Sequence, residues 1–266
     1  MITQLHVAKS AMFAYERNMQ IIADNIANAQ SIGFKERRLE LENTFPLTYE
    51  RVVTEYEEGG AGRRSRIKEL EYGNGVHIAT VSKNFTEGSI EITNRPLDLA
   101  VTNGNGLFQF RLPDGTIAYS RAGNLHLDRE GNIVSANGHA FEPPLRIPEG
   151  VSDQDIFIDD QGVISVLLPG ESTMREVGQI MLASFINPAG LRDIGQNLLQ
   201  ESAASGQPRL DRPGREGIGK IQPGALEFSN VNIIEQMMEM IMTQRMFDVA
   251  VKAVNACDVI LKKGWK

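Results

Sequence analysis

The chain has 266 residues, with 27 basic and 34 acidic side chains and a formal net charge of −7. This length supports one large domain or two modest ones with a buried core, which excludes a small scaffold held together by disulfides. The negative charge argues against a general nucleic-acid binder, which needs a broad positive field. A single cysteine, Cys257, can form no disulfide within the chain.

The first 30 residues have the periodicity of one long helix. Apolar side chains recur at alternating intervals of three and four residues, which is typical of a helix that buries one stripe. The segment from Asn28 to Gly33 predicts its end, because Asn and Gly tolerate the left-handed conformation that closes a helix. The stripe comprises Leu5, Ala8, Met12, Tyr15, Met19, Ile22, Ile26 and Ala29.

Charged residues interrupt the same N-terminal stretch at Lys9, Glu16 and Arg17, where a signal peptide needs a continuous apolar segment. The sequence also lacks a run of 18 apolar residues. We therefore expect neither a cleaved signal peptide nor insertion into a membrane.

The C-terminal end repeats the design of a long helix, with Asn232 placed to cap its first turn. Ile234, Met238 and Ile241 add a second apolar flank, which is too wide for contact with one partner helix. The predicted stripe is Ile233, Met237, Met240, Gln244, Phe247, Val251, Val254, Asp258 and Leu261. More than one neighbour is implied for this helix.

The middle of the chain changes to short alternating runs separated by turn residues, which predicts a β-rich region. Pro113, Asp114 and Gly115 predict a tight turn between two strands. Segments 125–135 and 156–166 share one plan of strand, Asp, two polar residues, Gly and strand, and predict two further hairpins. Segment 202–224 is rich in Gly and Pro and predicts an extended connector.

The segment between Pro46 and Gly75 is unusually charged and predicts an extended arm or a loose hairpin. Its basic residues Arg63, Arg64 and Arg66 follow an acidic run, so a charged face that pairs subunits is favoured over a nucleic-acid site. With Tyr49, these three arginines are the candidate residues of the arm.

Two one-sided helices at opposite ends of the chain leave apolar surface unpaired, and such a surface on a soluble chain indicates an interaction site. Contact between unlike surfaces of identical chains generates a ring or an open helix. A self-assembling structural protein is therefore favoured. Two alternatives are a soluble coiled-coil adaptor and a β-rich wall hydrolase, although the four histidines are scattered without the spacing of a metal site.

Several segments carry the motifs of one protein family. The segment ADNIANAQSIGFKERR (23–38) has two Asn three residues apart, then Ser, Gly, an aromatic and a basic residue: Asn25, Asn28, Ser31, Gly33, Phe34 and Lys35. It resembles the N-terminal motif of the family of bacterial flagellar rod and hook proteins. LEFSNVNIIEQMMEMIMTQRMFDVAVKAV (226–254) resembles its C-terminal signature. Segments 99–138 and 177–199 resemble its central β domain, so the resemblance covers nearly the whole chain.

Within the family, the length and the intact C-terminal elements are most similar to distal rod members, and Arg95-Pro96-Leu97-Asp98 resembles proximal rod members equally. The resemblance implies a structural subunit of the flagellar distal rod, with a proximal rod subunit as the alternative. It implies no catalytic residue, metal or cofactor. The implied shaft is hollow and rigid, carries torque from motor to hook and lets exported subunits pass.

The implied partners are further copies of the chain, proximal rod subunits, hook subunits, the surrounding basal-body rings and the flagellar export apparatus, without nucleic acid or membrane insertion. The implied location is the basal-body rod crossing the periplasm, reached by export without a cleaved signal peptide. The arm segment occupies the place where family members carry a subtype-specific stretch, which is implied to stiffen the rod.

The sequence thus predicts an α+β chain whose terminal helices form a coiled-coil-like polymerisation layer. We expect an N-terminal helix and motif (1–35), an arm or hairpin insert (36–88), a central β-rich domain (89–201), a connector (202–228) and a C-terminal helix (229–266). The predicted polymerisation interface comprises Leu5, Met12, Tyr15, Met19, Ile22, Asn25, Ile26, Asn28, Gly33, Phe34, Asn232, Ile233, Met237, Met240, Gln244, Phe247, Val251, Val254 and Leu261.

Overall fold

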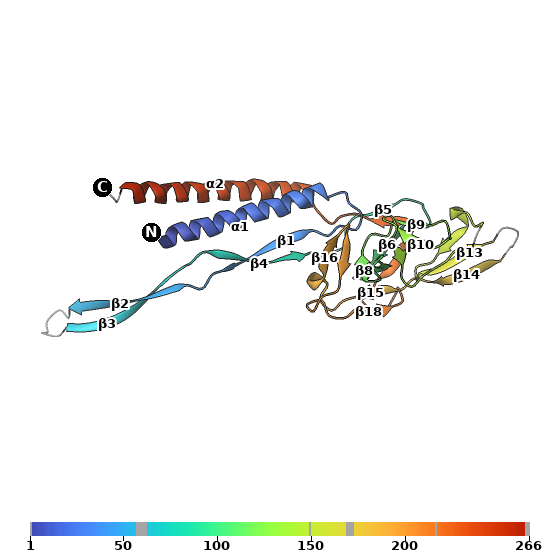
Figure 1. The fold of residues 1–266 in the computed structure, drawn as a ribbon, viewed down its shortest axis with the longest axis horizontal. Coiled ribbons are helices and arrows are strands. Elements are labelled where there is room, and N and C mark those ends of the chain that lie inside the picture. The colour runs from blue at the N-terminus through green and yellow to red at the C-terminus, as the bar shows by residue number, and fades with distance from the viewer. Residues whose placement is uncertain (1, 57–62, 149, 169–172, 216, 264–266) are drawn as a thin grey trace. The chain divides into compact units, whose positions relative to one another are not determined.

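The computed structural model describes residues 2–56, 63–148, 150–168, 173–215 and 217–263 (Figure 1). Helices and strands both contribute, so the predicted α+β class is confirmed. The chain forms two compact units. The first contains residues 1–23, 38–81 and 237–266, and the second contains residues 24–37 and 82–236. The five-segment division made from the sequence stays a prediction.

The two long helices are α1 (Ile2–Ala27) and α2 (Ile233–Lys263). Asn232 caps α2 as predicted, because its Oδ1 accepts a hydrogen bond of 3.1 Å from the Ile234 N–H. Over the part of the chain that is described, neither helix combines the length and apolar character that crossing a membrane requires.

Two antiparallel strand pairs follow α1 in the sequence. Strand β1 (Arg37–Asn43) pairs with β4 (Val76–Lys83), and β2 (Leu47–Tyr56) pairs with β3 (Arg63–Tyr72). The β2–β3 ladder runs from Leu47 opposite Tyr72 to Tyr56 opposite Arg63, so this segment is a regular hairpin and not a loose one. Gly59, Gly60 and Gly62 of the predicted arm lie outside the described residues.

The second unit contains a seven-stranded sheet in the order β16-β17-β8-β7-β11-β10-β9. Its members are β7 (Phe108–Arg111), β8 (Ile117–Ser120), β9 (Leu125–Leu127), β10 (Ile133–Ser135), β11 (Ala140–Phe141), β16 (Arg192–Gly195) and β17 (Leu198–Gln200). The hairpins predicted around 113–115 and within 125–135 are confirmed as β7–β8 and β9–β10.

Shorter sheets complete this unit. Strands β12 (Ile156–Ile158), β13 (Val163–Leu167) and β14 (Met174–Gln179) form a three-stranded sheet, which contains the third predicted hairpin. The two-stranded pairs are β5 (Ile90–Ile92) with β20 (Ala225–Glu227), β6 (Leu99–Thr102) with β19 (Lys220–Pro223), and β15 (Leu182–Ser184) with β18 (Arg209–Asp211). Two short 3₁₀ helices are η1 (Asp153–Asp155) and η2 (Pro188–Gly190).

The Gly- and Pro-rich segment expected as a connector therefore carries β18, β19 and β20. Each of these strands pairs with a strand from earlier in the chain. Their backbone N–H and C=O groups find partners on the edges of existing strands, which composition alone does not reveal.

Apolar side chains pack on both faces of the central sheet, because successive residues of a strand point to opposite sides. Phe108, Phe110 and Leu198 belong to the large core on one face. Leu107, Tyr119 and Leu199 belong to a smaller cluster on the other face, together with Phe185. The two faces of the sheet thus pack against different groups of apolar residues.

Candidate assembly site

The N-terminal and C-terminal motifs meet in one buried polar cluster of the second unit. We call this cluster the terminal-motif junction and define it by Asn25, Lys35, Glu36, Arg121, Glu227, Asn230 and Gln236. Six of these side chains are buried and belong to residues with less than a tenth of their surface exposed. Asn230 is half-buried. Such a cluster is stable only if its polar groups find partners.

Asn25 holds the end of α1 against the start of β1. Its Oδ1 accepts from the Arg37 N–H at 3.0 Å, and its Nδ2 donates to the Arg37 carbonyl at 2.9 Å. The side-chain amide of Asn25 thus pairs with both the N–H and the C=O of Arg37, in the way that the backbone of an adjacent β-strand does. Nδ2 also donates to Gln236 Oε1 at 3.0 Å, which links the N-terminal motif to the first turn of α2.

Gln236 and Asn230 extend this network to the segment after α1. Gln236 Nε2 donates to Glu36 Oε1 at 3.0 Å, and the Glu36 N–H donates to Asn230 Oδ1 at 2.8 Å. Asn230 Nδ2 donates to the Asn84 carbonyl at 2.9 Å. Each amide satisfies groups on two different segments, so the network specifies one arrangement of the motifs.

Asn28, Ser31 and Gly33 shape the chain where it leaves α1. Asn28 Nδ2 donates to the Asp24 carbonyl at 2.9 Å, and Ser31 Oγ donates to Asn28 Oδ1 at 3.1 Å. Gly33 has φ of 68°, and a Cβ at this position would lie 2.4 Å from the Ala122 backbone nitrogen. Only glycine fits this turn, because any side chain would clash and strain the backbone.

A charged triad lies at the centre of the junction. Glu227, which is fully buried, accepts from Lys35 Nζ at 2.6 Å with Oε1 and from Arg121 Nε with Oε2. Arg121 also donates to the carbonyls of Gly106 and Val101 at 2.6 and 2.7 Å. The carboxylate therefore ties the N-terminal motif, the β domain and the C-terminal motif together.

Burial and charge act in opposite directions on this triad. Burial alone would raise the pKa of Glu227, but the charges and hydrogen bonds of Arg121 and Lys35 outweigh it and hold the pKa below its usual value. For Lys35, burial dominates over its attraction to Glu227 and lowers the pKa. The Glu227 carboxylate is thus ionised at neutral pH, and it supplies the negative charge that Lys35 and Arg121 need in order to be buried.

On α1 the buried side chains include the large apolar Ile21 and Ile22, whereas on α2 the side chains buried within the chain are small or polar. On α2 they are Gln236, Thr243 and Ala250, spaced seven residues apart. Asn18 of α1 donates to Thr243 Oγ1 at 3.2 Å, which links the two helices directly. Small residues at a helix contact allow the backbones to approach closely.

The predicted apolar stripes lie beside these buried positions. Of the predicted interface residues, Ile22, Asn25, Gly33 and Phe34 are buried within the chain. Leu5, Met12, Tyr15, Met19, Ile26, Asn28, Met240, Phe247, Val251 and Val254 are half-buried, and Asn232, Ile233, Met237 and Gln244 are exposed. The side chains of Leu261, Tyr49, Arg63, Arg64 and Arg66 lie outside the described residues.

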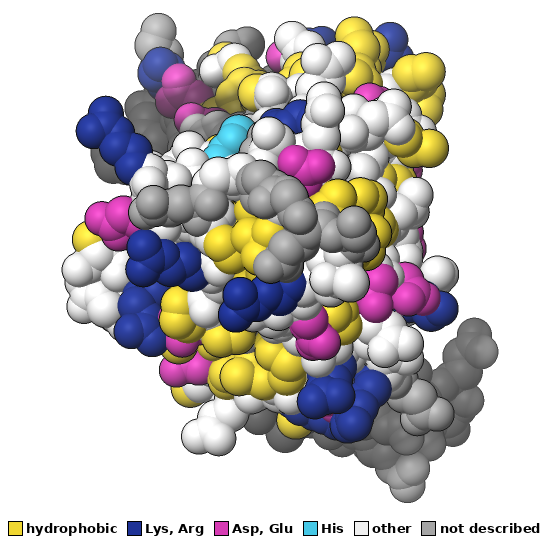
Figure 2. All heavy atoms as spheres, turned by 90° about the vertical axis from the view of Figure 1, so that its right-hand side faces the viewer, with side chains coloured by type: hydrophobic (Ala, Val, Ile, Leu, Met, Phe, Trp, Pro, Cys, Tyr) yellow, Lys and Arg dark blue, Asp and Glu magenta, His cyan; other side chains and the backbone are white. Residues whose placement is uncertain are grey.

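Along residues 234–242, the side of α2 opposite its buried positions is apolar and exposed, and further along the helix the same side carries the charged residues Arg245, Asp248 and Lys252. We call the apolar surface the outer face of α2 and define it by Ile234, Met237, Met238, Ile241, Met242 and Val249, each more than half exposed. By contrast, the face of the molecule in Figure 2 mixes hydrophobic side chains with Lys, Arg, Asp and Glu. An exposed apolar surface on a helix, such as the one concentrated in residues 234–242, is the kind of surface that proteins cover by association.

Comparisons with known proteins bear on what covers this face. Residues 101–166 match the model of the flagellar hook protein FlgE/F/G D1 domain, and residues 222–264 match that of the flagellar basal body rod FlgEFG protein C-terminal region. The flagellar basal-body rod protein FlgG of Borreliella burgdorferi is 36% identical, with 98% of this chain and 97% of the relative aligned. Its counterpart in Caulobacter vibrioides is 35% identical over 97% of this chain and 96% of the relative.

The chain belongs to the flagellar basal-body rod FlgEFG family. The predicted function as a structural subunit of the distal rod, and not an enzyme, is confirmed. The family also includes hook proteins: FlgE of Borreliella burgdorferi is 41% identical over 40% of this chain and 24% of its own length.

The matched family regions coincide with the parts described above. The C-terminal match contains Glu227, Gln236 and α2, and the D1 match contains β7 to β12, most of β13, and Arg121. Glu227, Arg121 and Gln236 cannot be recognised as site residues from this FlgEFG-family sequence, because an isolated charged or amide residue does not reveal its partners. The seven-residue spacing of Gln236, Thr243 and Ala250 is a signal for the buried side of α2.

Replacing Glu227 by Gln should strongly destabilise the second unit of the rod subunit. The change leaves Lys35 and Arg121 buried without their counter-charge, so we expect a loss of about 3–5 kcal/mol in the free energy of unfolding. Urea denaturation at pH 7 measures it. Asp160→Asn is the matched control, since its ion pair with Lys220 is exposed and contributes about 0–1 kcal/mol. Equal losses in both variants would contradict the central role of Glu227.

The same carboxylate predicts an acid-dependent stability. Because the pKa of Glu227 is lower in the folded than in the unfolded chain, its contribution is present above the unfolded value of about 4.3 and is lost as pH falls through the folded value. The stability difference between the unsubstituted chain and Glu227→Gln should therefore shrink below pH 4. Denaturation at pH 7, 4 and 3 tests this; a difference independent of pH would refute it.

Proposed function

We propose that many copies of this rod subunit stack helically into a hollow, rigid shaft that transmits torque from motor to hook and lets exported subunits pass. The observation that carries this proposal is the outer face of α2, an exposed apolar strip on one of two terminal helices. Covering such a strip with further copies removes apolar surface from water at about 25 cal/mol per Å². Assembly is thereby favoured.

We further propose that the buried and the exposed residues of the predicted interface have different roles. Asn25, Gly33 and Phe34 lie inside the chain and hold the terminal motifs in one conformation. Met237 and Ile233 are exposed and contact neighbouring copies. In this proposal α1 and α2 form the coiled-coil-like layer of the shaft, and the half-buried positions lie where two or more copies meet.

Rigidity would follow from the number of contacts made by each copy. If each outer face packs against several neighbours, bending the shaft must disrupt many close-packed contacts at once. The methionines of this face suit that task, since an unbranched thioether adapts to neighbours that are not equivalent.

We propose that the β2–β3 hairpin acts as an arm that contacts adjacent copies. Its register sets Glu55 opposite Arg64 and Glu50 opposite Glu69, so charged positions occur on both strands. A two-stranded ribbon is only marginally stable alone in water, which favours a role in which other subunits support it.

The remaining partners follow from family membership. We propose contacts with proximal rod subunits at one end, hook subunits at the other and the surrounding basal-body rings along the side. The proposed location is the rod where it crosses the periplasm, reached through the flagellar export apparatus without cleavage of a signal peptide.

Met238→Asp should block assembly without unfolding the subunit. The side chain is exposed in the single chain, so the carboxylate is tolerated there, but covering it in the shaft costs about 3 kcal/mol and lowers association about a hundredfold. Incorporation of the chain into isolated basal bodies measures assembly, and thermal melting of the purified chain measures folding. Met238→Leu keeps the surface apolar and is expected to assemble normally. Normal incorporation of Met238→Asp would overturn the assignment of this face.

Deleting residues 50–70 should soften the shaft and leave the second unit folded. The deletion removes most of the paired β2–β3 ladder, which lies in the first unit, and leaves the terminal-motif junction intact. Electron microscopy of isolated rods gives their curvature, and melting of the purified chain gives stability. If rods of the deletion variant are as straight as those of the full chain, the β2–β3 hairpin does not contribute to the stiffness of the shaft.

A further inference from the structure

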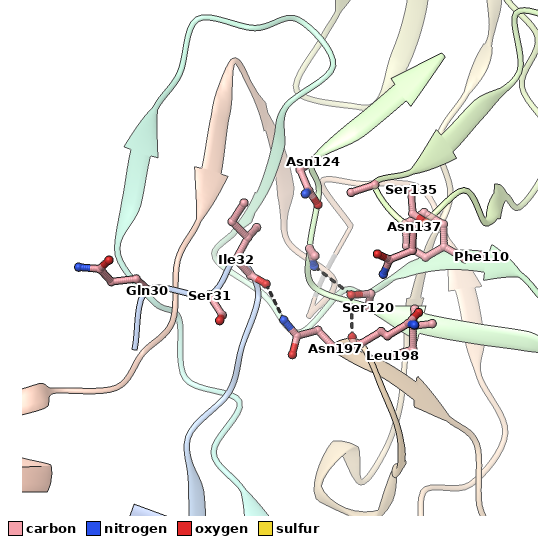
Figure 3. A pocket seen from close by; sticks show the side chains of 13 residues that line it. Gln30, Ser31, Ile32, Phe110, Ser120, Asn124, Ser135, Asn137, Asn197 and Leu198 are labelled. Atoms are coloured by element: carbon pink, nitrogen blue, oxygen red, sulfur yellow. Dashed lines mark hydrogen bonds between the residues drawn. The ribbon is translucent and has the colours of Figure 1, made fainter. Parts of the chain in front are cut away.

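A cleft of about 360 Å³ opens in the second unit between the segment that follows α1 and the central sheet (Figure 3). Ile32 gives it apolar surface, the buried Phe110 and Leu198 lie beneath it, and Asn124, Asn137 and Gln196 are among its polar lining residues. All its lining residues are uncharged. This chemistry fits a neutral segment with one apolar side chain and polar peptide groups.

The cleft is held open by its own hydrogen bonds. Asn197 Nδ2 donates to the Ile32 carbonyl at 3.1 Å, and Ser120 Oγ donates to the Asn197 carbonyl at 2.8 Å (Figure 3). Gln196 and Asn197 both have positive φ, 55° and 58°, as the two central residues of a tight hairpin turn do, so the turn between β16 and β17 beside the cleft has a defined shape. The site is therefore preformed, which lowers the cost of filling it.

A protruding turn elsewhere in the same unit has the complementary chemistry. Ile186 is 96% exposed, and it belongs to the uncharged segment FINPAG (185–190). The turn is anchored on both sides of Ile186: Phe185 packs on Tyr119 with ring centroids 4.9 Å apart, and Asn187 Nδ2 donates to the Ala204 carbonyl at 3.1 Å. The isoleucine is thus presented to solvent by a fixed backbone.

The turn and the cleft lie on opposite faces of the seven-stranded sheet. Phe110, Ser120 and Leu198 line the cleft and alternate along their strands with residues of the other face. Tyr119 and Leu199 point to that other face, where they pack with Phe185. A chain therefore cannot fill its own cleft with its own turn.

We propose that the turn carrying Ile186 in one copy inserts into this cleft of the next copy. The proposal rests on the assembly described above and names one of its contacts. Because the two surfaces are unlike and lie on opposite faces, the contact is heterologous and continues from copy to copy. Residues 30–32 form one wall, so the cleft is complete only when the N-terminal motif is docked, which couples folding of that motif to contact between β domains.

Substitution at the turn gives the first test. Ile186→Asp places a carboxylate in the uncharged cleft, so incorporation of the chain into isolated basal bodies should fall at least tenfold, the equivalent of about 1.4 kcal/mol. Ile92→Asp is the matched control, because Ile92 is 71% exposed in the same unit but outside the turn, and should assemble normally. Unchanged incorporation of Ile186→Asp, or an equal loss in both variants, would overturn the proposal. Thermal melting of both purified chains verifies that neither change unfolds the unit.

A small diazirine amino acid at position 186 gives the second test. After irradiation of assembled rods, we expect adducts between chains that map by mass spectrometry to 30–32, 135–137 or 196–198. Adducts confined to other segments, or none above the level seen with the probe at position 92, would refute the contact. If Met238→Asp blocks assembly while Ile186→Asp does not, the proposed function stands and this contact alone fails.

Discussion

The interaction on which the rest depends is the burial of the Glu227 carboxylate between Lys35 and Arg121. A carboxylate without solvent is tolerated only when it is paired and fully hydrogen-bonded, so its partners must occupy defined positions. These partners come from the N-terminal motif and the central β domain, while Glu227 itself leads into the C-terminal motif. One charge thereby fixes three distant segments of the chain. The amides of Asn25, Asn230 and Gln236 extend the same constraint to the ends of both helices.

The long helices divide their surface in a way that suits assembly. On α2 the residues buried within the single chain, such as Thr243 and Ala250, are small or polar, whereas its larger apolar side chains face outward. A monomeric protein would bury the larger side chains first, because they contribute more to the hydrophobic effect. The exposure of Met238 and Ile241 is consistent with a subunit whose apolar surface becomes buried against other subunits on assembly.

The fold class and many local elements could be predicted from sequence. The period of the apolar residues predicted both helices, and Asn232 was correctly identified as the cap of α2. The three turns with Asp and Gly also formed as hairpins, since a positive φ and an Asp side chain that accepts backbone N–H groups are local requirements. The segment at 202–228 was less predictable. Its strands exist because earlier strands offer them partners, and the pairings of β19 with β6 and of β20 with β5 join residues far apart in the chain, which leaves no local signal.

What the sequence determined by itself was therefore the local geometry, the family and the presence of apolar helices at both ends. Periodicity, caps and turns depend on residues a few positions apart, so their physical causes can be identified from a short stretch of sequence. Only the tertiary structure decided which side of each helix is buried and where Glu227 finds its counter-charges. It also decided that Ile186 and the amide-lined cleft occupy opposite faces of one sheet. These properties depend on which distant atoms come within hydrogen-bonding or van der Waals distance, and the folded chain alone specifies those distances.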